Sequence, residues 1–306
     1  MDNNLGKKKM RYKLLTVLAL LGATALSLSS CGDSSQPSGA RDSGTNGPYK
    51  LTIATDPKFE GGTTMEKLSK AKKITIGTKF DQPLFGQKGP DNKPRGFDVA
   101  IGSLVASRLG IPYEKIEWVE TVSINREPFV QQGRVDIVVA TYTINDERKK
   151  VIDFAGPYYE AGQSLMVLKS NNDVKGPENL RGKPVCSVEG STPAAHIVKD
   201  YGAKLVATDA YSKCLEPLRN GQVVAVTTDN VILAGFVDQN PEFKLVGEPF
   251  TKEPYGIGLK KNDDKLRTFI NDVLEEAEKD GTWKRLWQET AGKVLPTPNP
   301  PALARY

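Results

Sequence analysis

The chain has 306 residues, of which 42 are Lys or Arg and 37 are Asp or Glu, giving a formal net charge of +5 at pH 7. Residues 1–30 hold five of the basic residues and one acidic residue, which leaves 37 basic and 36 acidic residues and a net charge of +1. This balance lacks the positive field that nucleic-acid binding needs, so we expect no nucleic-acid partner.

Residues 1–30 have the pattern of an export signal. A basic start precedes an uncharged apolar stretch, 14–28, which is shorter than the roughly 20 residues that a membrane span needs. The stretch ends in Leu-Ser-Ser-Cys at 28–31, which resembles the lipobox of bacterial lipoproteins. We therefore expect a lipoprotein signal peptide over 1–30 and lipidation of Cys31, which would anchor the protein at the outer face of the cytoplasmic membrane. The alternatives are a secretory signal with a chance Cys and an uncleaved anchor.

Two further segments have the composition of unstructured chain. Residues 31–50 are almost entirely Ser, Gly, Pro, Asn, Asp and charged residues, which bury too little apolar surface to become ordered. We expect this segment to be a flexible tether. The Pro-rich residues 291–306 are expected to form a disordered tail.

Strands and helices alternate between these segments. A strand-poor lead-in at 51–72 is expected to contain a short helix near 65–71. Strands are then expected at 74–77, 116–119, 135–140, 162–168, 184–188, 205–206, 223–228 and 255–259. Helices are expected at 96–109, 126–132, 211–219, 231–237, 266–279 and 283–290, with others beginning at 147 and 191. Because the alternation restarts after residue 168, the pattern predicts an α/β protein with two lobes and parallel sheets.

Two cysteines remain once Cys31 is set aside. Cys186 is expected on a strand and Cys214 on the helix that follows. An isolated pair in an exported chain tends to form a disulfide in an oxidising compartment. The alternative is two buried free thiols.

Five motifs together resemble the polar amino-acid-binding proteins of ABC importers, solute-binding protein family 3. They lie at 96–99, 133–148, 153–159, 190–192 and 225–229. The resemblance covers about residues 72–290 and is strongest to the glutamate- and aspartate-binding members. It implies a two-lobed clamshell, the type II periplasmic-binding-protein fold, with ligand enclosed between the lobes.

The resemblance also implies the lobe boundaries. Lobe 1 would comprise 72–168, completed by 255–290, and lobe 2 would comprise 171–250. Two crossing segments between them would form the hinge.

The resemblance assigns one set of residues to the amino-acid head group. Arg148 would hold the α-carboxylate, since its planar fork makes two parallel charge-assisted bonds. Thr143 and the backbone around Thr141 would assist, and Thr192 would direct its N–H and hydroxyl at the carboxylate from a helix start. Asp229, at the end of a buried strand, would accept from the α-ammonium. The alternatives are a solvated helix arginine, an ordinary N-cap threonine and a helix-capping aspartate.

A second set would select the ligand's side chain. Lys79 and Arg126 are two cations that would repel each other in one pocket unless an anion lay between them, and a distal carboxylate supplies that anion. Arg126 ends a Ser-x-Asn-Arg run that begins at Ser123 and is similar to a run in acidic binders. Ser123 and Gln82 replace aromatic residues of many family members, and Tyr211 would cover the site from lobe 2. The alternatives are a surface lysine and an arginine paired with the adjacent glutamate.

The sequence offers little support for catalysis or metal binding. It contains no Gly-x-Ser-x-Gly, P-loop or zinc motif, and its one histidine, His196, has no Cys or His at metal-ligand spacing. We expect neither a cofactor nor a metal, and no enzymatic activity, although the fold also resembles certain dehydratases.

The resemblance implies the partners as well. We expect a monomer that binds an acidic amino acid, glutamate before aspartate, and delivers it to ABC permease subunits driven by a cytoplasmic ATPase. The alternatives are a glutamine or asparagine binder of the same fold and a sensor that presents the amino acid to a membrane receptor.

Overall fold

The structure, a computed structural model, describes residues 47–306. The expected signal peptide, the lipidation site at Cys31 and most of the expected tether lie outside these residues. No helix within 47–306 is long and apolar enough to cross a membrane. The end of the expected tether is not free chain, because Tyr49 is buried and its hydroxyl donates to the Gly96 carbonyl at 2.9 Å.

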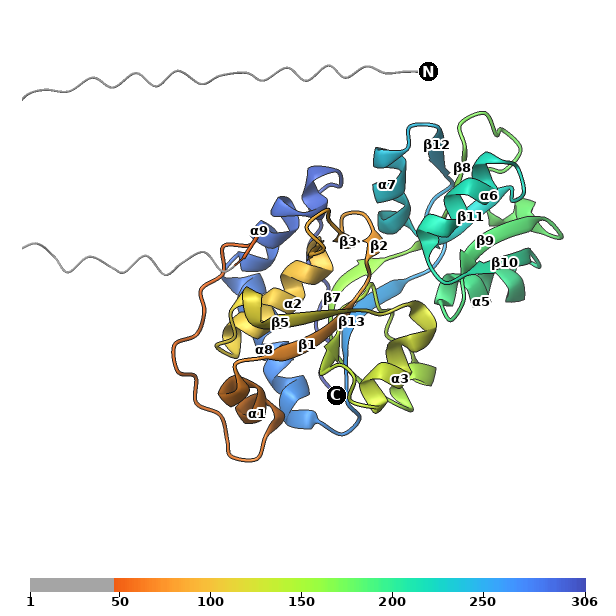
Figure 1. Cartoon of the computed structure of the whole chain (residues 1–306). Helices are drawn as coiled ribbons and strands as arrows, with labels where there is room; N and C mark the ends of the chain where they lie inside the picture. The colour runs from red at the N-terminus through yellow and green to blue at the C-terminus, as the bar shows by residue number, and fades with distance from the viewer. Residues whose placement is uncertain (1–46) are drawn as a thin grey trace, which may run out of the picture. The chain divides into compact units, whose positions relative to one another are not determined.

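Lobe 1 is built on a five-stranded mixed sheet, which lies at the centre of Figure 1. Its strand order is β5-β1-β6-β13-β7, with the bounds β1 (Ile74–Thr78), β5 (Ile116–Glu120), β6 (Ile137–Val138), β7 (Asp153–Ala161) and β13 (Glu253–Leu259). β1 is parallel to β5 and β6, but β13 is antiparallel to β6 and β7. The expectation of purely parallel sheets is therefore wrong, because β7 and β13, which connect to lobe 2, add antiparallel pairs.

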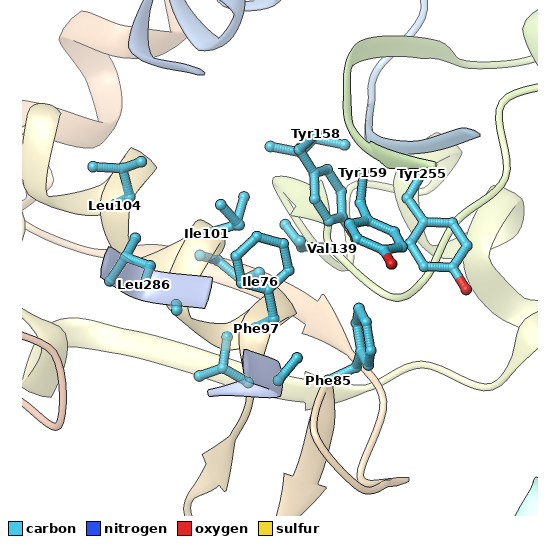
Figure 2. Close-up of a cluster of buried hydrophobic side chains, with 14 of the residues drawn as sticks. Ile76, Phe85, Phe97, Ile101, Leu104, Val139, Tyr158, Tyr159, Tyr255 and Leu286 are labelled. Atoms are coloured by element: carbon cyan, nitrogen blue, oxygen red, sulfur yellow. The ribbon is translucent and has the colours of Figure 1, made fainter. Parts of the chain in front are cut away.

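Helices from both ends of the described chain cover this sheet. They are α1 (Thr64–Ala71), α2 (Phe97–Arg108), α3 (Arg126–Gln131), α4 (Asp146–Lys149), α8 (Asp264–Lys279) and α9 (Thr282–Glu289). Phe97 on α2 packs edge-on against Trp283 and Trp287 of α9, with ring centroids 5.4 and 5.0 Å away. Figure 2 shows Phe97 in the same cluster as Phe85 and Tyr159. This aromatic core holds the C-terminal helices against lobe 1.

Lobe 2 has a second five-stranded sheet, with the order β10-β9-β11-β8-β12. Its elements are β8 (Gln163–Leu168), β9 (Pro184–Val188), α5 (Thr192–Lys199), β10 (Lys204–Thr208), α6 (Leu215–Arg219), β11 (Ala225–Asp229), α7 (Asn230–Gln239) and β12 (Phe243–Val246). β9 is parallel to β10 and β11, whereas β8 is antiparallel to β11 and β12. The strands β9 and β11 therefore end at the same edge of the sheet, where α5 and α7 begin.

Short elements complete the described part of the chain. A three-stranded ribbon joins β2 (Asp81–Gln82), β3 (Gly86–Lys88) and β4 (Pro94–Arg95). Single turns of 3-10 helix lie at Tyr113–Lys115, Ser123–Asn125, Pro177–Leu180, Tyr211–Cys214 and Ala291–Lys293. The ribbon places Gln82 immediately after β1, at the carboxyl edge of the lobe 1 sheet.

The chain passes between the two sheets twice. It leaves β7 for β8 at Gly162 and returns from β12 to β13 through residues 247–252. The expected end of lobe 1 at 168 is therefore wrong, because β8 (Gln163–Leu168) pairs within the lobe 2 sheet. The crossings are tied together, since Phe250 N donates to Gln163 O and Gln163 N donates to the Thr251 hydroxyl, both at 2.9 Å. The predicted fold class, an α/β protein with two lobes and a double crossing, is confirmed.

The expected disulfide is present. Cys186 on β9 is bonded to Cys214 at the end of a 3-10 turn, with the two Cα atoms 5.6 Å apart. Both residues are fully buried. The bond fixes the segment before α6 against the centre of the lobe 2 sheet.

The Pro-rich tail is not disordered, which corrects the expectation for 291–306. Ala304 N donates to Gly156 O at 2.9 Å, and the Tyr306 hydroxyl accepts from Phe154 N at 2.9 Å. Arg305 forms ion pairs with two carboxylates of α8. The composition suggested disorder, but β7 is an edge strand whose free polar groups the tail pairs.

Candidate functional site

A small polar cavity lies between the lobes. It is lined by Gln82, Ser123, Arg126, Thr141, Thr143, Ser191, Thr192, Pro193, Tyr211, Asp229 and Ile232. Seven of the nine ligand-binding residues expected from the sequence are in this lining. The other two, Lys79 and Arg148, donate hydrogen bonds to the lining residues Ser123 and Thr143. The strand ends of both sheets therefore bring all nine together.

A larger hollow, of about 1160 Å³, lies on the surface of lobe 1 near Tyr49. It contains none of the nine expected residues. Its charged groups include Arg95 and Glu289, which already pair with Asp91 and Arg285. The smaller cavity is the better candidate because its buried polar groups include unpaired ones.

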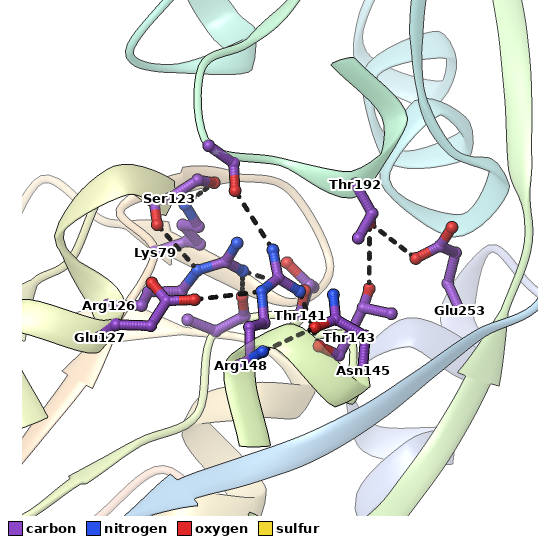
Figure 3. Close-up of polar contacts among 12 residues, drawn as sticks. Lys79, Ser123, Arg126, Glu127, Thr141, Thr143, Asn145, Arg148, Thr192 and Glu253 are labelled. Atoms are coloured by element: carbon purple, nitrogen blue, oxygen red, sulfur yellow. Dashed lines mark hydrogen bonds and ion pairs between the residues drawn. The ribbon is translucent and has the colours of Figure 1, made fainter. Parts of the chain in front are cut away.

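Arg148 connects the lobes at one end of the cavity (Figure 3). It lies on α4, whose N-cap Asn145 accepts from the Arg148 N–H at 2.9 Å. Its guanidinium donates to Thr143 O at 2.6 Å and, across the lobes, to Gly190 O at 3.2 Å. It also pairs with Glu127 at 3.1 Å, and burial lowers the pKa of Arg148 to about 10. This is a buried, oriented cation rather than a solvated helix arginine.

Lys79 and Arg126 are two further buried cations on the lobe 1 side, and Arg126 shares the Tyr142 ring with Arg148. Lys79 is only 4% exposed and donates to the Ser123 hydroxyl at 2.8 Å. Arg126 donates to the carbonyls of Ser123 and Ala140 at 3.2 and 3.3 Å and stacks over the Tyr142 ring at 4.1 Å. Neither cation forms a salt bridge with any carboxylate in residues 47–306. Burial first, and then the charge of Arg126, lower the pKa of Lys79 to about 7.

Asp229 supplies the opposite charge. It ends β11 at the position of a helix cap, but its side chain makes no capping bond to α7. Its Oδ2 accepts from the Tyr255 hydroxyl at 2.6 Å, while its Oδ1 is buried without a partner. Burial raises the pKa of Asp229 to about 7, and the charge of Glu253 adds to this shift. An unpaired buried carboxylate oxygen is suited to receive a cation.

Thr192 departs from its expected role in one respect. It opens α5 behind the N-cap Ser191, which accepts from Ala194 N at 3.2 Å. Its hydroxyl donates to Glu253 at 2.7 Å and lies 3.4 Å from the Thr143 hydroxyl. The hydroxyl proton is therefore directed at Glu253 and not at a ligand carboxylate.

The backbone at Thr141 is held in an unusual conformation. Its φ of +44° lies in the left-handed region, which residues other than Gly seldom adopt. Asp98 accepts from Thr141 N at 2.7 Å and from the Tyr158 hydroxyl at 2.6 Å, which fixes this turn. The Thr141 hydroxyl then donates to Gln82 Oε1 at 2.9 Å, leaving Gln82 Nε2 buried and without a partner.

Several cavity residues were not predicted from the sequence. The sequence marks Gln82 only as a departure from the family pattern, and it does not predict Ser191, Pro193, Ile232 or the neighbouring Glu253 as site residues. The sequence carried a signal for two of them, because Ser191 precedes Thr192 directly and Gln82 follows Lys79 by three residues. Tyr211, expected to cover the site, is buried in the cavity wall.

His196 is an ordinary, partly exposed residue within α5, as expected from its sequence context. Its ring nitrogens lie 2.8 Å from Gln163 Oε1 and 2.8 Å from Asp200. Within residues 47–306, no group of three or more His, Cys, Asp or Glu side chains is arranged to hold a metal ion.

Residues 74–292 match the bacterial extracellular solute-binding proteins, family 3. The chain belongs to this family. The glutamate-binding protein GluB of Corynebacterium glutamicum is 39% identical over 291 residues, covering 90% of this chain and 90% of GluB. The ABC transporter glutamine-binding protein GlnH of Bacillus subtilis is 39% identical over 229 residues, covering 74% of this chain and 84% of GlnH.

A solved structure supports the same family. An ancestral arginine-binding protein bound to arginine is similar to this chain with a TM-score of 0.67 and 39% identity, covering 71% of this chain and 97% of that one. The two-lobed fold of the family is therefore shared over most of residues 47–306. As a family member, the protein is an extracytoplasmic solute-binding protein.

Proposed function

We propose that this protein captures an acidic amino acid, glutamate before aspartate, and delivers it to an ABC importer without altering it. The observation that carries this proposal is the distribution of unpaired charge around the cavity. Among the described residues, Lys79 and Arg126 have no salt bridge to a carboxylate, and Asp229 Oδ1 has no hydrogen-bond partner. An acidic amino acid supplies an ammonium for Asp229 and a distal carboxylate for the two cations.

The head group would be held between the lobes. Arg148 would receive the α-carboxylate, with the Thr192 N–H and the 141–143 turn beside it. The ligand's α-carboxylate would share or replace the hydrogen bonds that Arg148 now donates to the Thr143 and Gly190 carbonyls. Gln82 Nε2 is a further donor available to a ligand carboxylate.

A thermal-shift screen of free amino acids tests this proposal. Glutamate should raise the melting temperature most, aspartate should follow, and arginine and leucine should have no effect. Ligand recovered from the complex should be chemically unchanged. A response confined to basic or apolar amino acids would refute the proposal.

Glutamine is the second candidate, and two observations favour it. One relative, GlnH, is named as glutamine-binding. The amide of Gln82 could also present its oxygen to a glutamine amide, because the Thr141 hydroxyl can either donate or accept. A neutral ligand would, however, leave Lys79 and Arg126 uncompensated.

We also propose that the protein is held at the membrane by lipid on Cys31. The lipobox at 28–31 and the extracytoplasmic family support this anchor. Cys31→Ala should release the protein from the membrane fraction or leave the precursor uncleaved. Wild-type processing and retention of the Cys31→Ala variant would contradict the proposal. Pull-down of the wild-type protein would separate a permease partner from a membrane sensor.

A further inference from the structure

Glu253 is a buried carboxylate that was not among the expected site residues, although it accepts a hydrogen bond from one of them. It is the first residue of β13, is 4% exposed and lies where the chain returns to lobe 1 (Figure 3). Its two oxygens accept from the hydroxyls of Thr192 at 2.7 Å and Thr251 at 2.9 Å. It forms no salt bridge within residues 47–306. The charge of Arg148 interacts with it, but its hydrogen bonds come only from hydroxyls, so a further cation close by would stabilise this buried carboxylate.

The bond to Glu253 decides what Thr192 can do. A threonine hydroxyl has one proton to donate and two lone pairs with which to accept. The 2.7 Å contact with Glu253 is much shorter than the 3.4 Å contact with Thr143, so the proton is committed to Glu253. Thr192 then faces the cavity as an acceptor, and the ligand group that an acceptor binds is the ammonium.

Asp229 lies near the same point of the cavity. Its unpaired Oδ1 is an acceptor, and the negative charge of Glu253 acts on it strongly enough to raise its pKa. The other groups that act on Asp229 are Tyr255, which donates to it, and the cations Arg126 and Arg148. Two carboxylates whose charges act on each other are both stabilised when a cation binds near them.

We propose that Glu253 is a positioning residue of the ammonium subsite. It orients the Thr192 hydroxyl so that its oxygen faces the α-ammonium of the ligand, and its charge acts there together with that of Asp229. This role rests on the proposed amino-acid ligand. It adds to that proposal a second carboxylate, contributed by the hinge rather than by the ends of the lobe 2 strands.

Glutarate provides the test, because it is glutamate without the α-ammonium. Calorimetry should compare both ligands on the wild type and on Glu253→Gln, which keeps the shape and removes the charge. Glutamate affinity should fall about tenfold or more, and glutarate affinity should change by less than about threefold. Glu253→Asp should restore part of the glutamate preference. The exposed Glu160→Gln is the matched control and should change neither affinity.

Two further measurements separate this role from a purely structural one. Thr192→Val should also reduce the glutamate-to-glutarate ratio, and the double variant with Glu253→Gln should lose less than the sum of the two single losses, because Glu253 acts in part through Thr192. This arm also decides the matter if Glu253→Gln fails to fold. Removing the Glu253 charge should also shift the acid-side loss of glutamate affinity to lower pH, because Asp229 would ionise more easily.

Equal losses for glutamate and glutarate in Glu253→Gln would overturn the role of Glu253 and leave the proposed function intact. An unchanged ratio in Thr192→Val would also overturn it. A wild-type protein that binds glutarate as tightly as glutamate would overturn both proposals, since no ammonium subsite would then exist.

Discussion

At the scale of single residues, buried charges of both signs surround the cavity without salt bridges to one another. Within residues 47–306, Lys79 and Arg126 have no carboxylate in a salt bridge, and Asp229 and Glu253 have no cation in one, although the charges of Arg126 and Arg148 act on Asp229. Desolvating these groups opposes folding, and a ligand that carries both signs would offset that cost. The affinity for amino acids in general and the preference for glutamate over glutamine should therefore depend on different residues.

Selectivity for a distal carboxylate should depend on the pair of cations. Arg126→Met keeps most of the volume and removes one charge, so glutamate binding should weaken by about 1 to 3 kcal/mol. Glutamine should lose much less, since its neutral amide needs no cation. Lys79→Met should act in the same direction. Calorimetric titrations with both ligands give the ratio of affinities, and the glutamate preference is falsified if both variants leave it unchanged.

Arg148→Ala is the matched comparison. It removes a partner that the α-carboxylate of every amino acid requires, so glutamate and glutamine should both weaken, by about 3 to 5 kcal/mol. The ratio of their affinities should stay close to that of the wild type. A selective loss of glutamate alone would place Arg148 at the distal carboxylate instead.

The depressed pKa of Lys79 predicts a pH dependence of stability. Its pKa falls from an ordinary 10.5 to about 7 in the folded protein, so the unfolded chain holds more protons between about pH 7 and 10.5. The free energy of unfolding of the ligand-free protein should therefore rise with pH across this window through Lys79. Urea unfolding at several pH values should show a smaller rise in Lys79→Met. If the free energy of unfolding rose equally with pH in both proteins, the claim that Lys79 is buried with a lowered pKa would be wrong.

The resemblance to the family, and not spacing alone, predicted these residues, because Arg148 and Thr192 lie inside its motifs. Asp229 was also predicted from its place at the end of a buried strand, where ligand sites of α/β proteins form. Glu253 could not be found in this way. Its partner Thr192 is 61 residues away along the chain, and only the return crossing brings the two together.

At the scale of elements, the disulfide is the main covalent constraint on lobe 2. It closes a loop with a sequence separation of 28 residues between β9 and the turn before α6. In the chain-entropy model such a closure contributes roughly 3 kcal/mol by restricting the unfolded chain. The double variant Cys186→Ser, Cys214→Ser should lose about this much in urea unfolding.

Reduction of the wild-type protein provides the control for that variant. Dithiothreitol should lower the free energy of unfolding of the wild type and leave that of the double variant unchanged. Mass spectrometry should find no alkylatable thiol at these two positions in the native protein. Two reactive thiols would rule out the bond in solution.

Elements with an amphipathic or apolar sequence pattern were predictable. Elements that depend only on hydrogen bonds to a distant segment were not. The helix at 266–279 was expected from its amphipathic pattern and occurs as α8, and the short helix expected near 65–71 occurs as α1. The ribbon β2-β3-β4 has strands of two or three residues, too short for any periodicity. Disorder was expected for the tail because its composition is Pro-rich. The composition does not reveal that the tail hydrogen-bonds to the edge strand β7.

At the scale of the whole described region, the lobes meet around the cavity as well as within it. Gln87 and Gln239 exchange two amide hydrogen bonds, of 3.3 and 3.1 Å, and Ser212 N donates to Asp81 at 3.1 Å. With the bond from Arg148 to Gly190, these contacts join lobe 1 to lobe 2. A ligand that bonds to both lobes should favour this arrangement, because it binds the closed state better than an open one.

The most direct test of the central claim is the ratio of glutamate to glutamine affinity in the wild-type protein. Isothermal titration of ligand-free protein at pH 6 to 7, where a cationic Lys79 is favoured, measures both constants under one condition. The unpaired cations predict that glutamate binds at least about tenfold more tightly than glutamine. Glutamine binding that equals or exceeds glutamate binding would contradict the claim and point to a neutral amide ligand in the same head-group site.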